Sequence, residues 1–183
     1  MDNKLEKFKN LFQKSSLSDF VIVHHKGDCV WGICEDCANN VERIFDRNLA
    51  PVIPHHLRCD CYKLSIETIK VGQVSKMGIN APDFWLKAYG VLPDYYITKD
   101  EAITKYGWND RRNTLSGKAF GKMIGGDVYK NISAKLPIKP DRVWYECDVD
   151  YETGNRNSKR LYYSNDGLMF YSKDHGITFY QAK

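Results

Sequence analysis

The stretch RVWYECDVDY, residues 142–151, decides the fold class because its residues alternate in character with a period of two. Side chains of a β-strand point alternately to the two faces of the sheet, so this alternation predicts a strand. One face carries Val143, Tyr145, Cys147, Val149 and Tyr151, and the other carries Trp144, Glu146, Asp148 and Asp150. We expect the first face to cover a core and the acidic face to remain open.

The residues that follow predict further short strands. Residues 159–163 and 168–171 flank Ser164-Asn165-Asp166-Gly167, which is typical of a hairpin turn. After another turn, Thr178-Phe179-Tyr180 predicts a last strand. This part of the chain therefore favours an antiparallel meander.

The residues before this stretch carry helix signals instead. Pro82 suits the first turn of a helix and Gly90 suits its end. Thr98 and Glu101 have the spacing of a capping box at the start of a second helix. Farther on, Gly125-Gly126 predicts a tight turn. Helices first and strands later predict an α+β fold, with N-terminal helices packed on a C-terminal antiparallel β-sheet.

The N-terminal part of the chain differs in kind. Five of the six cysteines and four of the five histidines lie between residues 24 and 61. Residues 2–14 place Leu5, Phe8 and Phe12 on one face of a short amphipathic helix. We therefore divide the chain into an amphipathic helix plus a small Cys/His module at 1–72, a linker at 73–80 and the main domain at 81–183.

Two cysteine pairs in this module have metal-ligand spacing. Cys34-Glu35-Asp36-Cys37 is followed by His55-His56-Leu57-Arg58-Cys59-Asp60-Cys61, and such mixed sulfur and nitrogen sets suit Zn²⁺. The alternative is a reduced or disulfide-bridged loop without metal. We favour a structural zinc ion whose ligands are Cys34, Cys37, His56 and Cys59, with Cys61 as the substitute.

Composition narrows the class of protein. The chain has 183 residues, 27 Lys+Arg against 23 Asp+Glu, a net charge of +4 and 43% hydrophobic residues. These values predict a globular chain with a core, permit RNA as a partner and exclude a polybasic tail. No apolar run is long enough to span a membrane, and the polar start predicts no signal peptide. We expect synthesis in the cytoplasm, followed by export through a non-Sec route or packaging in a virion.

The main domain holds one acid, one imidazole and several cations that suit cleavage of RNA. Glu146 would take the proton of a 2′-hydroxyl, and His175 would protonate the departing 5′-oxygen. Lys99, Arg156 and Arg160 would stabilise charge on the phosphorane. The alternative reading is an ordinary solvated strand face and an exposed turn histidine.

The order of several short blocks is more specific. From residue 81 to 181 the chain resembles barnase-type bacterial ribonucleases in LPDYYITKDEA (92–102), GW (107–108), GKMIGGD (121–127), KLP (135–137), WYECD (144–148), GNRNSKR (154–160), YSND (163–166) and DHGITF (174–179). The resemblance implies that Glu146 is the general base and His175 the general acid. It places Lys99, Arg156 and Arg160 at phosphate-binding and transition-state-stabilising positions.

The same resemblance implies the reaction and a partner. We expect metal-independent endonucleolytic cleavage of single-stranded RNA through a 2′,3′-cyclic phosphate. We also expect a toxin-like effector that is neutralised by a barstar-like inhibitor with acidic groups. An inactive nuclease-fold adaptor and a zinc-dependent nucleic-acid binder are the alternatives.

Two departures from the family pattern concern base recognition. The family's guanine-reading loop ends in Asn-Arg-Glu, whereas this chain has Asn131-Ile132-Ser133. Lys130 and Asn131 therefore remain as the expected substrate-binding residues of this loop. The aromatic residue that follows the histidine in the family is Gly176 here, which removes a stacking surface.

A second resemblance covers residues 29–62. Cys-x-x-Cys followed by Pro54-His55-His56-Leu57-Arg58-Cys59-Asp60-Cys61 is similar to the C-terminal segment of phage minor head proteins, with one extra histidine. It implies a metal-stapled module that attaches the nuclease to a phage capsid or a toxin-delivery machinery.

Overall fold

The computed structural model describes residues 18–26, 35–54 and 59–183. The chain divides into two compact units. We call residues 68–130 and 142–183 the sheet unit, and the described part of 16–67 together with 131–141 the cysteine unit. The amphipathic helix expected at residues 2–14 lies outside the described residues.

The sheet unit is built on seven strands in the order β4-β10-β9-β8-β7-β6-β5. The strands are β4 (Thr68–Ile69), β5 (Tyr96–Ile97), β6 (Met123–Tyr129), β7 (Trp144–Asp148), β8 (Arg160–Ser164), β9 (Met169–Ser172) and β10 (Tyr180–Ala182). The pairs from β6 to β10 are antiparallel, as expected, but the short edge strands β4 and β5 pair in parallel with β10 and β6. The sheet is therefore mixed, and the fold class is α+β.

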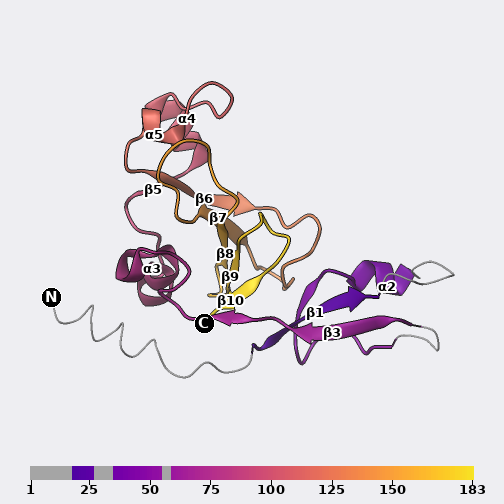
Figure 1. Cartoon of the computed structure of the whole chain (residues 1–183). Coiled ribbons are helices and arrows are strands. Elements are labelled where there is room, and N and C mark those ends of the chain that lie inside the picture. The colour runs from indigo at the N-terminus through magenta and orange to yellow at the C-terminus, as the bar shows by residue number, and fades with distance from the viewer. Residues whose placement is uncertain (1–17, 27–34, 55–58) are drawn as a thin grey trace. The chain divides into compact units, whose positions relative to one another are not determined.

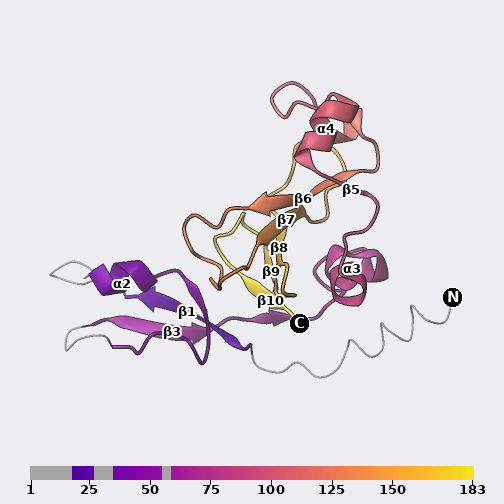
Figure 2. The ribbon, with the colours of Figure 1, turned by 180° about the vertical axis from the view of Figure 1, so that it is seen from behind.

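The helical elements of this unit are η1 (Gly78–Asn80), α3 (Pro82–Tyr89), α4 (Lys99–Tyr106) and α5 (Leu115–Lys118). Figure 1 shows α4 and α5 near β5 and β6, and α3 nearer to β8–β10; Figure 2 shows the same unit from behind. The signals read from the sequence are confirmed at both main helices. Pro82 opens α3 and Gly90 ends it in the left-handed conformation. Thr98 and Glu101 form the capping box of α4.

The alternation predicted for residues 142–151 is confirmed only in part, because Trp144 and Asp148, on the face expected to be open, are buried, and Val143 is exposed. Cys147 and Val149 are buried in the core of the sheet unit, together with Phe84 of α3 and Ala102 of α4. Glu146 points to the other face and lies opposite Tyr162 in the register between β7 and β8. The face that carries Glu146 is therefore set by the burial of its neighbours.

The tight turn expected at Gly125-Gly126 is wrong, because both glycines lie inside β6. The register with β7 shifts between Gly125 and Asp127, and Gly126 has a φ of 92°, which marks a bulge. A Cβ on Gly125 would lie 2.5 Å from Cys147 Cβ. The glycines thus permit a bulge and a close strand approach, which the sequence alone does not distinguish from a turn.

Two further boundaries differ from the expectation. The last strand begins at Tyr180 rather than Thr178, because Asp174 accepts hydrogen bonds from the backbone N–H and hydroxyl of Thr178 and keeps that residue in the turn. The segment 73–80, expected as a linker, belongs to the sheet unit, where Val74 is buried in the core.

The cysteine unit contains a three-stranded sheet in the order β2-β1-β3. Its elements are β1 (Phe20–His25), α2 (Glu35–Asn40), β2 (Ile44–Asp46) and β3 (Cys61–Ser65). One small core cluster of buried residues consists of Val23, Cys37 and Cys61, with a few half-buried neighbours. Phe20, Val21, Ile44, Ile66 and Leu136 of the same unit are buried as well.

Across the described residues, every helix is too short or too polar to cross a membrane.

Candidate active site and cysteine cluster

The start of α4 brings a lysine to the acidic face of β7. Lys99 Nζ lies 2.6 Å from Glu146 Oε1, and the backbone N–H of Lys99 donates to Asp127 Oδ2 over 3.0 Å. The capping box formed by Thr98 fixes this first turn. Glu146 is 16% exposed and Lys99 40% exposed, so both side chains can be reached by a substrate.

Two residues beyond Glu146, Asp148 lies buried beneath a pair of guanidinium groups. Arg156 donates Nε to Asp148 Oδ2 and Nη2 to Asp148 Oδ1, each over 2.7 Å. Burial lowers the pKa of Arg156, but the hydrogen bonds and charge of Asp148 outweigh it and raise the pKa. This bidentate pair holds the planar cation beside β7 and keeps it charged.

Arg160 is more deeply placed. Its Nε lies 3.2 Å from Asp148 Oδ1, within ion-pair distance but misaligned for a hydrogen bond. Its Nη1 donates to the carbonyls of Asn157 and Lys159. The side chain is 4% exposed, and burial lowers its pKa. Arg160 therefore adds a second positive charge beside Asp148, and its side chain is almost closed off from solvent.

His175 lies in the turn between β9 and β10 and is exposed. It has a φ of 60°, and its backbone N–H donates to the carbonyl of Ser158 over 2.9 Å. Asp174 braces the turn by accepting from the hydroxyls of Ser172 and Thr178 and from two backbone N–H groups. Burial alone would raise the pKa of Asp174, but these hydrogen bonds hold it at about 2. The hydrogen bonds of Asp174 thus stabilise the turn that carries the accessible imidazole of His175.

Tyr162 connects the two halves of the site and was missed in the sequence. It lies opposite Glu146 on β8, and its hydroxyl lies 3.1 Å from the place where a Cβ on Gly176 would be. Its ring packs against Tyr129 at 4.7 Å and against Phe179 at 5.7 Å. Burial raises the pKa of Tyr162, so the hydroxyl stays neutral. The available signal was its place in the strand expected at residues 159–163, which follows the acidic strand in the expected meander.

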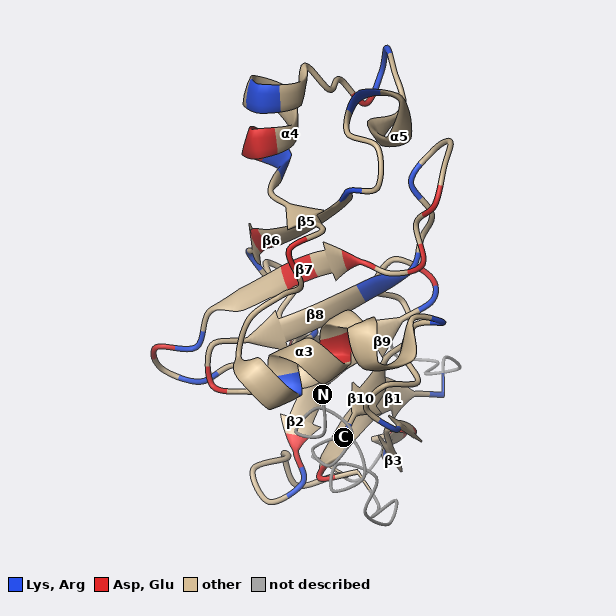
Figure 3. Cartoon of the chain, turned by 90° about the vertical axis from the view of Figure 1, so that its left-hand side faces the viewer, with Lys and Arg blue, Asp and Glu red and all other residues tan. Residues whose placement is uncertain are grey.

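Charge gathers on the strands that carry these residues. In Figure 3 the red of β7 and the blue of β8 lie on neighbouring strands. A carboxylate, a lysine and a bidentate arginine on one sheet face form a polar surface that can accept a proton and bind an anion. The sheet therefore supplies a base and cations, and the β9–β10 turn supplies an imidazole.

Two hollows lie near these strands. One, of about 280 Å³, is bordered by Arg156, Asn155 and Trp108. A larger one, of about 600 Å³, is bordered by Tyr145 and Tyr163. Because Tyr145 alternates with Glu146 along β7, the larger hollow belongs to the opposite face of the sheet. The larger of the two hollows is therefore not the one that borders the charged residues.

The two residues expected to bind substrate follow β6. Lys130 is exposed. Asn131 closes its own loop, since its side chain donates Nδ2 to the carbonyl of Leu136 and accepts the backbone N–H of Leu136 on Oδ1. Asn131 thus shapes the loop with its side-chain atoms.

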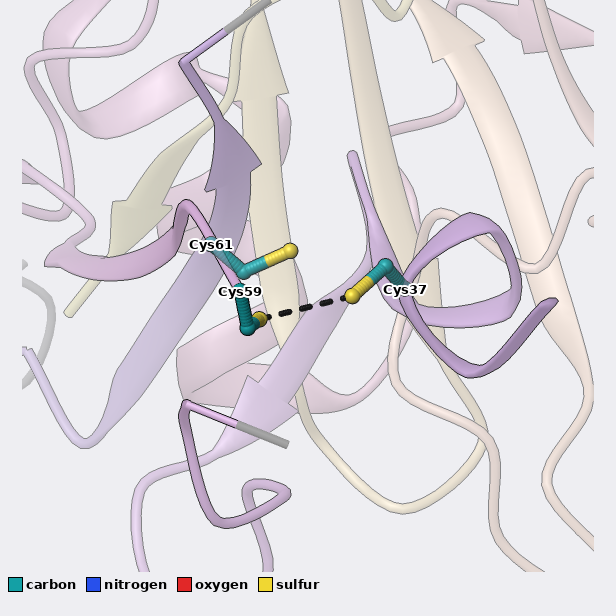
Figure 4. A group of neighbouring side chains, drawn as sticks. All are labelled: Cys37, Cys59 and Cys61. Carbon is teal, nitrogen blue, oxygen red and sulfur yellow. Dashed lines mark hydrogen bonds between the residues drawn. The ribbon is translucent and has the colours of Figure 1, made fainter. Parts of the chain in front are cut away.

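Three of the five expected metal ligands come together in the cysteine unit. Cys37, Cys59 and Cys61 place their sulfur atoms within 4.8 Å of one another (Figure 4). The sulfur atoms of Cys37 and Cys59 are 3.4 Å apart, which is far longer than the S–S bond of a disulfide. Three thiolates bound tetrahedrally at about 2.3 Å from zinc would be separated by roughly 3.8 Å, so this cluster could hold a metal. Cys34 and His56 lie outside the described residues.

Comparison with known proteins assigns the C-terminal half of the chain to a family. A family model described as ribonuclease matches residues 88–183. Ribonucleases from Heyndrickxia coagulans, Bacillus intermedius and Bacillus pumilus are each 44% identical over 95 residues, or 52% of this chain. The match spans 86% of the first protein and 58% of each of the other two.

Proposed function

The chain belongs to the ribonuclease family, which makes it an endoribonuclease, and we propose that it cleaves single-stranded RNA without a metal ion. The observation that carries the proposal is the ion pair between Lys99 and Glu146 on the open face of β7, beside the Arg156–Asp148 pair. Base and cations are thereby held before RNA arrives, which lowers the reorganisation that the reaction needs.

In the proposed reaction Glu146 accepts the proton of a 2′-hydroxyl. The 2′-oxygen then attacks phosphorus, the bond from phosphorus to the 5′-oxygen breaks, and His175 donates a proton to that oxygen. The products are a 2′,3′-cyclic phosphate and a free 5′-hydroxyl. Glu146 takes up one proton and His175 gives up one, so the step needs no oxidant, reductant or metal.

The cations stabilise the negative charge that builds on the phosphorane. Lys99 and Arg156 are exposed enough to contact a phosphate, at 40% and 22% of their side-chain surfaces. Arg160, at 4%, supports them by compensating Asp148. Lys130 follows β6 and would contact the RNA strand, while Asn131 shapes the loop beside it.

The experiment is cleavage of an end-labelled single-stranded RNA in excess EDTA, with the products resolved by their termini. We expect cyclic-phosphate ends from the intact chain and no product from an RNA in which 2′-hydroxyls are replaced by hydrogen. Glu146→Gln should remove the activity, whereas Glu152→Gln, which changes an exposed acid in the following loop, should retain it. Cleavage that requires a divalent metal would contradict the mechanism.

The cysteine unit has its own proposed role as a zinc-stapled module. Cys37 and Cys61 are buried, and Cys59 places its sulfur atom within 4.8 Å of theirs. A zinc ion bound by these thiolates would stabilise the unit, with the fourth ligand expected from the sequence at Cys34 or His56. One zinc per chain, lost in Cys59→Ser and retained in Cys147→Ala, would support this. Cys147 is a suitable control because burial raises its pKa well above the ordinary thiol value.

The exposed cations support a proposal about the biological role. We propose a toxin-like effector that a barstar-like inhibitor neutralises by placing acidic groups against Lys99 and Arg156. The resemblance of residues 29–62 to phage minor head proteins favours a module that attaches the nuclease to a capsid or delivery machinery. Expression of the chain alone should arrest bacterial growth, and expression of Glu146→Gln should not. Equal arrest by both would contradict this role.

A further inference from the structure

The segment 131–141 joins the two nuclease strands β6 and β7 but folds as part of the cysteine unit. It begins two residues after Tyr129, the last residue of β6, and ends three residues before β7 starts at Trp144. A connection between neighbouring antiparallel strands is normally a local hairpin loop. Here it is built into a unit whose other residues precede the whole nuclease sheet in sequence.

Backbone and side-chain hydrogen bonds fasten the segment to β2. The N–H of Ile44 donates to the carbonyl of Lys135 over 2.7 Å. Arg43 donates Nε to the carbonyl of Ala134 over 3.2 Å and Nη1 to the carbonyl of Asn39 over 2.7 Å. Because β2 is an edge strand of its sheet, the segment occupies an edge that would otherwise be open.

The segment is also ordered within itself. Asn131 and Leu136 exchange two hydrogen bonds between the side chain of one and the backbone of the other. The N–H of Ala134 donates to the carbonyl of Asn131 over 2.8 Å, and both residues have positive φ values. These are strained conformations for residues other than glycine, so their order depends on the contacts that hold them.

The same contacts lead back to the cysteine cluster. Cys37 lies on α2, and the N–H of Val41 donates to its carbonyl over 2.9 Å. The chain then turns so that the N–H of Val23 donates to the carbonyl of Arg43. Cys37 is six residues before Arg43, and Phe45 of β2 packs against the small core that contains Cys37 and Val23.

We infer that the cysteine unit orders residues 131–141 directly after Lys130, the residue that the proposed function places on RNA, so that metal occupancy at Cys37, Cys59 and Cys61 sets the affinity of the nuclease for RNA. This inference rests on the proposed function. A segment that is ordered before RNA arrives costs less entropy on binding than one that must be ordered by RNA. Loss of the metal releases β2, the segment loses its support, and KM rises while the proton-transfer groups on β7 and in the β9–β10 turn remain in place.

The test compares Arg43→Met with a matched control, Arg47→Met, in the full chain. Arg47 donates to Ser18 and Ser65 within the same unit, so its loss removes an equal charge without touching residues 131–141. Each variant is measured with one equivalent of zinc and after removal of zinc. The readouts are KM and kcat for RNA cleavage and the hydrogen exchange of backbone amides in 131–136.

We expect zinc to slow exchange in 131–136 and to lower KM by roughly fivefold or more in the wild type and in Arg47→Met. Arg43→Met should bind zinc but keep the high KM and fast exchange, with kcat unchanged. Exchange and KM that respond neither to zinc nor to Arg43→Met would overturn the inference. If the wild type cleaves no RNA, the proposed function fails, and the exchange data alone still decide whether the unit orders the segment.

Discussion

Lys99 Nζ lies 2.6 Å from Glu146 Oε1, which joins the first residue of α4 to the middle of β7. The ammonium group is half-exposed and the carboxylate is largely covered. Without RNA, the ammonium group of Lys99 orients the carboxylate of Glu146. When RNA is bound, the same ammonium group can contact a phosphate. In the proposed mechanism the pair therefore serves both proton transfer and charge stabilisation.

Lys99→Met should reduce kcat/KM by roughly 10²–10³-fold, because one stabilising cation is lost at the reacting phosphate. Stability should change little, since the side chain of Lys99 is 40% exposed and solvent partly screens its ion pair. The control is Lys105→Met, which removes the equivalent cation of the exposed Lys105–Glu101 pair on the same helix. Equal kcat/KM values for the two variants would contradict the assignment of Lys99 to the active site.

Arg156→Lys should lower activity and stability together. A lysine cannot reproduce the two parallel hydrogen bonds to the buried Asp148, so that carboxylate loses part of its compensation. Arg142→Lys is the matched control, because Arg142 also binds a carboxylate through two nitrogens, that of Asp166. RNA cleavage assays and urea denaturation measure both effects. Unchanged kcat/KM in Arg156→Lys would contradict the assigned role.

We expect Asp174 to position His175, because it accepts hydrogen bonds across the turn that carries the imidazole. Its pKa is held at about 2, below the ordinary 3.8, so the charged form stabilises the fold above pH 3.8 and this contribution is lost as the pH falls through 2. In Asp174→Ala the free energy of unfolding should therefore depend less on pH between pH 4 and pH 2 than in the wild type. It should also lower kcat with little change in KM, because the turn sets where the imidazole lies. A change confined to stability would show a purely structural role.

Asp83 should have the opposite pH dependence. Burial raises its pKa from 3.8 to about 6, against the lowering effect of backbone hydrogen bonds such as that from Gly72. Between those pH values the folded state keeps a proton that the unfolded state releases, so stability falls as pH rises. Asp83→Asn should gain about 3 kcal/mol over the wild type between pH 4 and pH 7. Urea denaturation at both pH values, with Asp94→Asn as an exposed control, measures the difference.

Local pattern predicted the helices and the acidic strand well because their signals are local. The capping box of α4 and the alternation of β7 each depend on residues close in sequence. The bulge at Gly125-Gly126 depends on β7, which lies some twenty residues away, so the glycines read as a turn. Thr178 was placed in a strand because its hydrogen bonds to Asp174 have no sequence signature.

The site residues also divide into those that the sequence predicts and those that depend on contacts between distant segments. The family resemblance named Glu146, His175 and the cations, but it could not foresee that Tyr162 lies between the base and the histidine turn. Cys61, considered only as a substitute ligand, lies with Cys37 and Cys59 because it begins β3 beside them. The assignment of residues 131–141 to the cysteine unit depends on contacts across about ninety residues, which no local pattern contains.

The assignment of Glu146 as base and His175 as acid is tested most directly with an RNA whose scissile 5′-oxygen is replaced by sulfur. A thiolate leaves without being protonated, so this substrate needs a general base but no general acid. We predict that His175→Ala, nearly inactive on ordinary RNA, cleaves the sulfur-substituted RNA at close to the wild-type rate in EDTA, whereas Glu146→Gln stays inactive on both. Failure of the sulfur to rescue His175→Ala, or rescue of both variants alike, would contradict the account.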